Sequence, residues 1–315
     1  MNKPFNVIVV GEINVDLIFN EVESFPEVGK EKLAEKMTLT LGSSAAIFAC
    51  NLSALGMSVS FIGKIGNDIF GHFCKEQLEQ KGVDTSMLIM SNELKTGATA
   101  VLNFDEDRAN VTYQGAMKNL CIDDITKEML KKADHLHFSS YFLQPGFKND
   151  AGKLFKMANE CGLSTSFDMQ WDPTEKWDLD YKAVLPFVDI FLPNETELLK
   201  LTGKLSIEAA IEHIKDIAKS IIVKLGNKGS LSYSNGKTVL KPAFLNNKVV
   251  DAIGAGDSFN AGFIYKFLKE APVEACQTFG NLMGAVSTTA AGGTSAFTDL
   301  KTTLKIAKEK FDYEG

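Results

Sequence analysis

Short apolar segments with β-strand character recur along the chain, separated by stretches whose apolar residues have helical spacing. The strand-like segments are NVIVVG (6–11), VSFIGKIG (59–66), DHLHFSS (134–140), STSFDMQ (164–170), VDIFLPN (188–194) and SIIVKLG (220–226). Helical spacing is clear in SSAAIFACNLSALG, DIFGHFCKEQLEQKG, NDAGKLFKMANECG and IEAAIEHIKDIAK. Apolar strands that alternate with helices predict an α/β fold, in which a mostly parallel sheet is covered by helices on both faces.

Two regions interrupt this alternation. Residues 13–41 contain strand-like pieces without a convincing helix, and residues 97–115 read as two alternating runs joined by an acidic turn. We expect both to form antiparallel pieces that stand off the main sheet. Asn235-Gly236 predicts a late hairpin turn, and the pattern from Asp251 onward is helical. Because no internal repeat or interdomain linker is visible, we expect one domain over residues 1–315.

Composition excludes several classes of function. The net charge is −7 and the lysines are scattered among acids, so we expect no nucleic-acid partner. No apolar run reaches the roughly 18 residues of a membrane-spanning helix, and Glu12 and Asp16 interrupt the apolar N-terminal stretch, which argues against a signal peptide. The five cysteines, without a CxxC pair, predict reduced, buried thiols in a cytoplasmic protein. His135 and His137 alternate on one strand without a third ligand, so packing is favoured over metal binding.

The stretch VVDAIGAGDSFNAGF (249–263) combines a glycine-rich turn with a carboxylate and then a helical pattern. A helix start presents unpaired N–H groups that bind phosphate readily, and Gly254 and Gly256 let the chain approach an anion closely. Asp257 at that position can accept a proton from a hydroxyl that attacks the phosphate. The residues alone leave a second interpretation open, in which Asp257 only caps a helix after a glycine turn.

The same stretch resembles the C-terminal signature of the ribokinase-like, or PfkB, carbohydrate kinases, usually written D-T-x-G-A-G-D, with Ala252 in place of Thr. The resemblance continues over nearly the whole chain and in family order, through GEINVDLI (11–18), FIGKIGNDIFG (61–71) with GVDTS (82–86), LPNETELLKLTG (192–203), VKLGNKGS (223–230) and FGNLMGAVSTTAAGG (279–293). It implies a three-layer α/β/α ribokinase-like fold with a mostly parallel central sheet. It also implies a small β-sheet lid, formed by residues 13–41 and 97–116.

For the acceptor, the resemblance implies a sugar-binding role for Asn14, Asp16, Gly42 and Ser43. Strand alternation also aims Asn14 and Asp16 to the same side, as two ligands to a polyol require. Gln170 begins the segment QWD at the end of a strand, where loops of open α/β sheets bind ligands. We therefore take Gln170 as a candidate substrate contact, with a packed tryptophan turn as the open alternative.

For the nucleotide, the resemblance implies ATP and Mg²⁺, with contacts from Asn194, Lys224, Gly226, Gly229 and Asn281. Asn194 and Glu197 match an N-x-x-E motif placed near Mg²⁺ and its waters, although the same spacing also predicts a capping box. In the catalytic turn, the resemblance makes Asp257 the base and the N–H groups of Gly254, Ala255 and Gly256 the anion hole. It also implies a monovalent-cation (K⁺) site near Asp251 and Ile253.

Two departures from the ribokinase pattern leave the acceptor open. LGSSAA (41–46) stands where ribokinases have G-G-K-G-A-N, and no acid occurs in HLHFSSYFLQP (135–145), where ribokinase has a glutamate. The prediction is an ATP-dependent kinase acting on a hydroxyl of a small ribose- or fructose-like carbohydrate, with a homodimer implied by the clasped lids of related sugar kinases. Two alternatives remain. One is a nucleoside kinase whose base slot uses Phe104, Tyr113 or Trp171, and the other is a non-catalytic sugar sensor.

Overall fold

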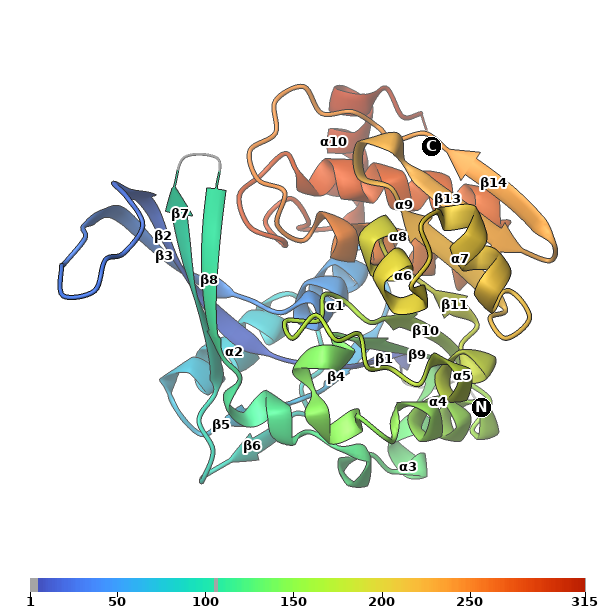
Figure 1. The fold of residues 1–315 in the computed structure, drawn as a ribbon, viewed down its shortest axis with the longest axis horizontal. Helices are drawn as coiled ribbons and strands as arrows, with labels where there is room; N and C mark the ends of the chain where they lie inside the picture. Colours follow the sequence, from blue (N-terminus) through green and yellow to red (C-terminus); the bar gives the residue numbers. More distant parts are fainter. Residues whose placement is uncertain (1–4, 105–106, 315) are drawn as a thin grey trace.

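The computed structural model of the protein describes residues 5–104 and 107–314. Its centre is an eight-stranded sheet in the order β14-β13-β12-β11-β10-β9-β1-β4 (Figure 1). These strands are β1 (Phe5–Val10), β4 (Val59–Ile62), β9 (Ala133–Ser139), β10 (Ser164–Asp168), β11 (Ile190–Phe191), β12 (Ser220–Lys224), β13 (Ser230–Ser234) and β14 (Lys237–Lys241). Strands from β12 to β4 in this order are parallel, and the β13–β14 hairpin at Asn235-Gly236 is antiparallel. The predicted mostly parallel sheet is confirmed.

Helices cover both faces of this sheet. They are α1 (Ser44–Ala54), α2 (Ile69–Gln80), α3 (Lys127–Leu130), α4 (Ala151–Glu160), α5 (Tyr181–Val184), α6 (Glu195–Thr202), α7 (Ile207–Ile214), α8 (Ala255–Phe267), α9 (Val273–Ser287) and α10 (Leu300–Phe311). Val7 and Val9 of β1 share a core with α1, α2 and α8–α10, whereas Ile8 and Val10 share the opposite core with α3–α7. Because alternate strand residues supply two separate cores, the fold has three layers.

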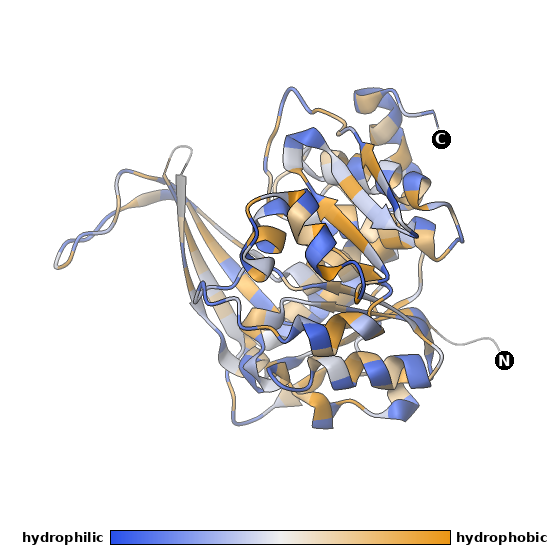
Figure 2. Ribbon diagram, turned by 45° about the vertical axis from the view of Figure 1, so that its right-hand side comes forward, coloured by the Kyte–Doolittle hydropathy of each residue, from blue (hydrophilic) through white to orange (hydrophobic). Residues whose placement is uncertain are grey.

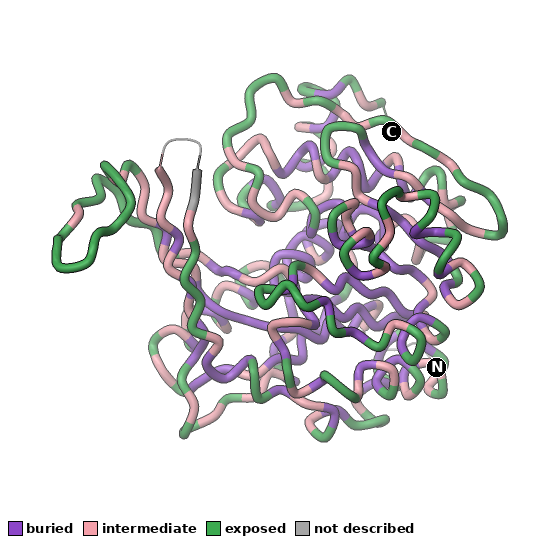
Figure 3. Tube along the Cα trace, viewed as in Figure 1, coloured by how far each residue is buried: buried purple, intermediate pink, exposed green. Residues whose placement is uncertain are grey.

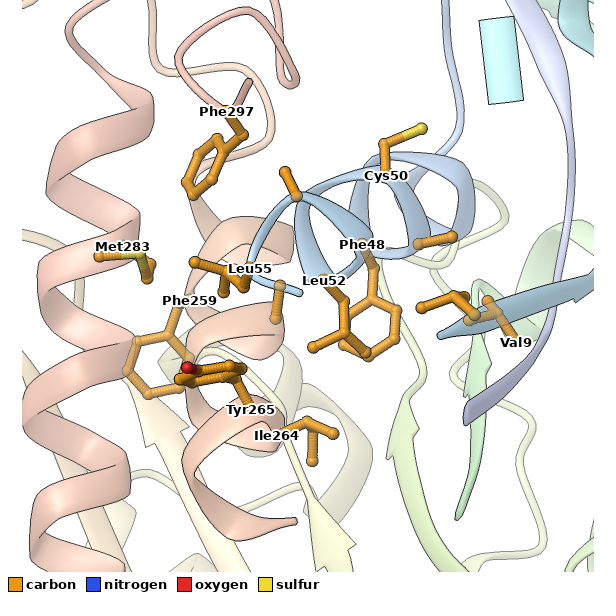
Figure 4. Packing of buried hydrophobic residues seen from close by; sticks show 14 of the residues in the cluster. Val9, Phe48, Cys50, Leu52, Leu55, Phe259, Ile264, Tyr265, Met283 and Phe297 are labelled. Carbon is orange, nitrogen blue, oxygen red and sulfur yellow. The ribbon is translucent and has the colours of Figure 1, made fainter. Parts of the chain in front are cut away.

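Helix α8, which carries Asp257 in its first turn, is fixed by the first of these cores. Figure 4 shows Phe48 and Leu52 of α1 between β1 and the α8 residues Phe259 and Ile264. The strands of the central sheet are mostly apolar and buried, whereas polar and exposed residues gather on the outer surfaces (Figures 2 and 3). The start of α8 is therefore held rigidly against the sheet.

A second, four-stranded sheet projects from the body of the molecule (Figure 1). Its order is β3-β2-β7-β8, formed by β3 (Ala34–Leu41), β2 (Asn14–Val22), β7 (Gly97–Phe104) and β8 (Asp107–Tyr113). We call it the small sheet. Its outer pairs are antiparallel as predicted, but β2 and β7 pair in parallel, because both strands leave the body side by side, starting from the Asn14–Gly97 pair.

Two further expectations need correction. VSFIGKIG does not form one strand: it divides at Gly63 into β4 and β5 (Lys64–Gly66), and β5 pairs with β6 (Ile89–Ser91) in a separate two-stranded sheet. A Cβ at Gly63 would lie 2.6 Å from the Phe61 ring, so glycine permits this bend. All five cysteines are free, but Cys121 and Cys161 are only half-buried.

The predicted domain span 1–315 and the lid segment 97–116 include residues 1–4, 105–106 and 315, which lie outside the described residues. Among the described helices, none combines the length and the apolar character needed to cross a membrane.

Candidate active site

The predicted site residues gather where the parallel strands of the central sheet end. Asn14 follows β1, Gln170 follows β10, Asn194 follows β11 and Lys224 ends β12, and the first turn of α8 lies close to them. Asn194 and Lys224 form an isolated parallel bridge just beyond the sheet. This edge is where open α/β sheets bind ligands, because the loops that leave the strands converge there.

The turn before α8 has a backbone that only small residues can form. Gly254 has a φ of 73°, and a Cβ added there would lie 2.7 Å from the Gly293 Cα. A Cβ at Gly256 would meet only the Lys224 side chain, at 3.8 Å, so this glycine is open. The N–H groups of Gly254 and Gly256 have no acceptor among the described residues, whereas that of Ala255 donates to the Ala252 carbonyl at 3.3 Å. Unpaired donors at a helix start suit an anion.

Asp257 is only 6 % exposed. Burial, followed by the nearby Asp168 carboxylate, raises the pKa of Asp257 to about 8, and the Lys224 ammonium opposes this rise. A carboxyl group whose pKa lies near neutrality can exchange a proton at physiological pH, as general acid–base catalysis requires. The Asp257 carboxyl can therefore change its protonation state near physiological pH.

Asp168 connects the predicted residues to one another, although the sequence analysis did not select it. Its fully buried carboxylate accepts hydrogen bonds from Lys224 Nζ at 2.6 Å, from Gln170 Nε2 at 2.9 Å and from Asn260 Nδ2. Gln170 Nε2 also donates to Asp257 Oδ1 at 3.0 Å. Gln170 therefore bridges the two carboxylates and holds Asp257 from one side.

Asn194 and Glu197 form the capping box of α6. Asn194 Oδ1 accepts the Glu197 N–H at 2.9 Å, and the Glu197 carboxylate accepts the Asn194 N–H and the Asn194 side-chain amide at 2.9 and 2.7 Å. Glu197 is 3 % exposed, and burial together with Asp168 raises its pKa to about 7. Both oxygens already accept a hydrogen bond, which fits contact with the waters of Mg²⁺ better than direct ligation.

A pocket of about 470 Å³ opens beside Gly256. Among the residues that line it are Lys224, Gly226, Gly229, Phe244, Gly256 and Asn281. The predicted nucleotide residues Lys224, Gly226, Gly229 and Asn281 are thus brought together, and Asn194 lies next to Lys224. The Asn281 amide donates to the carbonyls of Lys241 and Pro242 at 3.2 and 3.0 Å, so it fixes the wall of the pocket.

The predicted acceptor residues form a second group. Asn14 Nδ2 donates to Asp16 Oδ1 at 2.9 Å and to Thr99 Oγ1 at 3.1 Å. Burial raises the pKa of Asp16 to about 6. A Cβ at Gly42 would lie 2.3 Å from Asp16 Oδ1, so glycine is required where this segment passes the carboxylate. Ser43, the N-cap of α1, accepts the Ala46 N–H at 3.0 Å.

Three of the nine described non-glycine residues with a positive φ lie near this group or near Asp257. Ser43, Ser140 and Gln170 have φ values of 79°, 58° and 60°, in the left-handed region that is costly for residues other than glycine. Such strain persists only where the surrounding structure imposes it, and it is often found at binding sites.

The predicted cation residues lie in the loop before α8. The Asp251 carboxylate accepts the Ile253 N–H and the Gly292 N–H, each at 2.9 Å, and so ties this loop to residues 292–293. His135 and His137 are buried and hydrogen-bonded to Ser164 and Ser166, a packing role as predicted.

Besides Asp168, two polar residues at the site were missed. Asn260 lies one turn after Asp257 and bonds Asp168, and Glu12 is a buried carboxyl at the end of β1. A usable signal existed for Glu12, which comes just after the apolar run of β1, whereas Asp168 follows the mostly polar STSF (164–167) and is marked only by its place at the end of a parallel strand.

Residues 5–300 match the pfkB family carbohydrate kinase. The chain belongs to this family. It is 33% identical to a protein named uncharacterized sugar kinase from Archaeoglobus fulgidus, over 74% of this chain and 92% of that protein. It is 26% identical to a nucleoside kinase from Methanothermobacter thermautotrophicus, over 100% of this chain and 99% of that protein.

Among solved structures, the pfkB-family chain is similar to Arabidopsis thaliana ribokinase complexed with ribose and ATP. The two share 25% sequence identity and superpose with a TM-score of 0.83, over 96% of this chain and 99% of the ribokinase. These likenesses identify the protein as a sugar or nucleoside kinase with the ribokinase-like fold predicted from its motifs.

Proposed function

We propose that this pfkB-family kinase transfers the γ-phosphoryl group of ATP, bound as MgATP, to a hydroxyl of a small ribose- or fructose-like carbohydrate. The observation that carries the proposal is the position of Asp257. This buried carboxyl follows the unpaired N–H groups of Gly254 and Gly256, and Gly256 lines the 470 Å³ pocket. A proton acceptor and an anion-binding turn thus adjoin in one site.

In the proposed reaction, Asp257 accepts the proton of the acceptor hydroxyl while that oxygen bonds to the γ-phosphorus and the bond to the ADP oxygen breaks. The N–H groups of Gly254, Ala255 and Gly256 stabilise the negative charge on the transferring group. Because the Ala255 N–H donates to the Ala252 carbonyl at 3.3 Å, its contribution requires that this long hydrogen bond breaks.

Lys224 and the α6 capping box serve the donor side. We propose that the Lys224 ammonium, held by Asp168, contacts the ATP phosphates from the wall of the pocket. Asn194 and Glu197 hold the waters of the Mg²⁺ that arrives with ATP, an ion that shields the phosphate charge. Asp251 and Ile253 remain the proposed monovalent-cation (K⁺) site, which would support the turn that carries Gly254.

We infer that the small sheet acts as a lid over the acceptor, as the family resemblance implies. One of its faces buries Ile18 and Val101, whereas the other leaves Met37, Leu39 and Val111 exposed by 60%, 37% and 68%. An apolar sheet face of this kind is usually covered, and we propose that the small sheet of a second copy covers it.

Val111→Lys is then expected to convert a dimer into a monomer in sedimentation experiments, and a monomeric wild type contradicts this. We place this homodimer in the cytoplasm, where free thiols stay reduced.

A nucleoside is the second candidate acceptor. Trp171, next to Gln170 and 45% exposed, packs edge-on against Trp177 with ring centroids 5.1 Å apart. A half-exposed indole so close to the residue that holds Asp257 can stack on a nucleobase. The other predicted base-slot residues are Phe104, which packs on Phe25, and Tyr113, which is exposed.

The test is ADP release over a panel of sugars and nucleosides, with wild type and Asp257→Asn. We expect turnover of at least one acceptor and a loss of about 10²–10⁴-fold in kcat for the variant, because it lacks a base. Wild-type rates in the Asn variant would overturn the role of Asp257. Binding of an acceptor without turnover would favour the sugar sensor.

A further inference from the structure

Glu12 is a buried carboxyl that the proposed reaction does not use. It follows β1 directly and is 2% exposed. The preceding Gly11 packs so tightly on α1 that an added Cβ would lie 2.2 Å from the Ala45 Cβ. The end of β1 is thus pressed against the start of α1, and the Glu12 side chain is confined to the space between them.

The two carboxyl oxygens of Glu12 differ. Oε1 accepts the Ser44 N–H at 2.7 Å and lies 3.4 Å from the Ala45 nitrogen, which caps α1. Oε2 is buried and has no hydrogen-bond partner among the described residues. Buried polar atoms are almost always hydrogen-bonded, so Oε2 has the capacity to accept a hydrogen bond from a bound group in addition to the nearby hydroxyls of Ser43 and Ser140. Burial also raises the pKa of Glu12 to about 7.

The surroundings of Glu12 are those of the acceptor group. The hydroxyls of Ser43 and Ser140, two residues with left-handed backbone, lie near enough to lower the pKa of Glu12. The hydroxyl of Ser44 lowers the pKa of Asp257, whereas the charge of Glu12 raises it. Glu12 and Asp257 therefore both lie close to Ser44, and Asn14 follows Glu12 by two residues in the sequence.

The group formed by Glu12, Asn14 and Asp16 differs from the nucleotide side in having no lysine paired to it within the part of the chain that the structure describes. Among the described residues, no lysine or histidine is hydrogen-bonded or ion-paired to Glu12, Asn14 or Asp16. The nearest lysine that faces Asp257 is Lys224, and Asp168 already holds it. A phosphate or carboxylate on the acceptor would meet these carboxyl groups with no counter-charge paired to them among the described residues, which is costly in a buried site.

We propose that Glu12 is a specificity-determining residue whose free Oε2 hydrogen-bonds a hydroxyl of the acceptor, and that the acceptor is an uncharged polyol rather than a sugar phosphate or a sugar acid. The proposal rests on the proposed function, because it assigns Glu12 to the acceptor side of the same site. A hydroxyl can pair with a carboxyl in either of its protonation states, whereas an anion is repelled by the ionised carboxylate and can pair only with the protonated form.

The experiment compares wild type with Glu12→Gln and Glu12→Ala. Glutamine keeps an oxygen for the Ser44 N–H and places an amide where Oε2 stands, so it preserves the helix cap and changes only the free position. Glu128→Gln, an exposed substitution on α3, is the matched control. Probes are D-ribose, D-fructose and adenosine, against ribose 1-phosphate and gluconate. Binding is measured by the thermal shift that each probe causes, and turnover is measured by ADP release.

We expect wild type and Glu128→Gln to bind and phosphorylate an uncharged probe in preference to both anions. In Glu12→Gln, the KM for that probe is expected to rise about 10-fold, because the amide in place of Oε2 makes a weaker hydrogen bond to a hydroxyl than a carboxylate does, with the KM for ATP unchanged. Glu12→Ala is expected to lose thermal stability as well, because it also removes the helix cap.

The remaining outcomes distinguish a failure of the Glu12 inference from a failure of the proposed reaction. Equal binding and KM in Glu12→Gln and wild type would show that Glu12 only caps α1, and would overturn this inference while the kinase activity stands. Preference of the wild type for ribose 1-phosphate or gluconate would overturn the assigned substrate class alone. If the wild type binds an uncharged probe without turnover and Glu12→Gln does not bind it, the inference stands and the proposed reaction fails. If the wild type neither binds nor phosphorylates any probe, both fail.

Discussion

The phosphate side and the acceptor side of the site are built in different ways. On the phosphate side, Asp168 joins Lys224, Gln170 and Asn260 in a buried network, and both oxygens of Glu197 are bonded to Asn194. On the acceptor side, Glu12 has an unpaired oxygen, and the adjoining small sheet is largely exposed away from the body (Figure 3).

We attribute this difference to the ligands that we propose for the two sides. A phosphate chain is the same in every reaction of a kinase, so the side chains around it can be held in advance by the protein's own hydrogen bonds, while the N–H groups of Gly254 and Gly256 stay open for the phosphate. An acceptor must be selected from similar molecules, and unpaired polar groups achieve that selection because they penalise a ligand that leaves them unsatisfied. The phosphate side is therefore expected to respond to mutation through stability and kcat, and the acceptor side through the acceptor KM.

Asp168→Asn is expected to have the largest effect on stability. It leaves the buried Lys224 ammonium without its main partner, at a cost of about 3–5 kcal/mol in the free energy of unfolding. Denaturant titration measures this loss. The double variant Asp168→Asn/Lys224→Met is expected to recover part of the stability and none of the activity. Recovery of activity would show that Lys224 has no role at the phosphates.

Gly254→Ala is expected to have the second-largest effect on stability. The positive φ alone costs about 1–2 kcal/mol, and the added Cβ would also lie 2.7 Å from the Gly293 Cα. Gly56→Ala is the matched control, because Gly56 has a φ of 96° and nothing within 4 Å of an added Cβ. We expect Gly254→Ala to lower both the unfolding free energy and kcat, and Gly56→Ala to lower the unfolding free energy alone. Similar kcat losses in both would remove the special role of this turn.

Asp16→Asn probes the acceptor side with a smaller expected effect on stability. Asp16 is half-buried and its carboxylate accepts a hydrogen bond from Asn14, which an asparagine oxygen can still accept. The KM for the acceptor is expected to rise about 10-fold through loss of a charged hydrogen bond, and the KM for ATP to stay unchanged. Initial-rate kinetics over both substrates check this. A rise in both KM values would mean that the two sides are not separable.

Much of the fold could be predicted from the sequence, because periodicity is local. The strands of the parallel sheet, the helices between them and the Asn235-Gly236 hairpin all follow from apolar spacing and turn residues. The break at Gly63 and the parallel pairing of β2 with β7 could not be predicted in this way, since both depend on how distant segments pack.

The candidate site residues also differ in whether local sequence or tertiary packing marks them. Gly254, Gly256 and Asp257 could be selected because a glycine turn before a helix carries its own chemistry. Asp168 ends β10 and Glu12 lies just beyond β1, and only their tertiary neighbours distinguish them from turn acids. The Gln170 amide, selected as a substrate contact, hydrogen-bonds the two carboxylates of Asp168 and Asp257 in the ligand-free structure.

The central claim, that Asp257 takes the acceptor proton, is tested most directly by the pH dependence of kcat/KM for the acceptor. The pKa of Asp257 in the ligand-free protein is raised to about 8, and only the deprotonated carboxylate can act as a base. We therefore predict that kcat/KM of the wild type rises as the pH increases through about 8, and that Asp257→Asn loses this rise along with most of its activity. The same rise with pH in both proteins would contradict the claim.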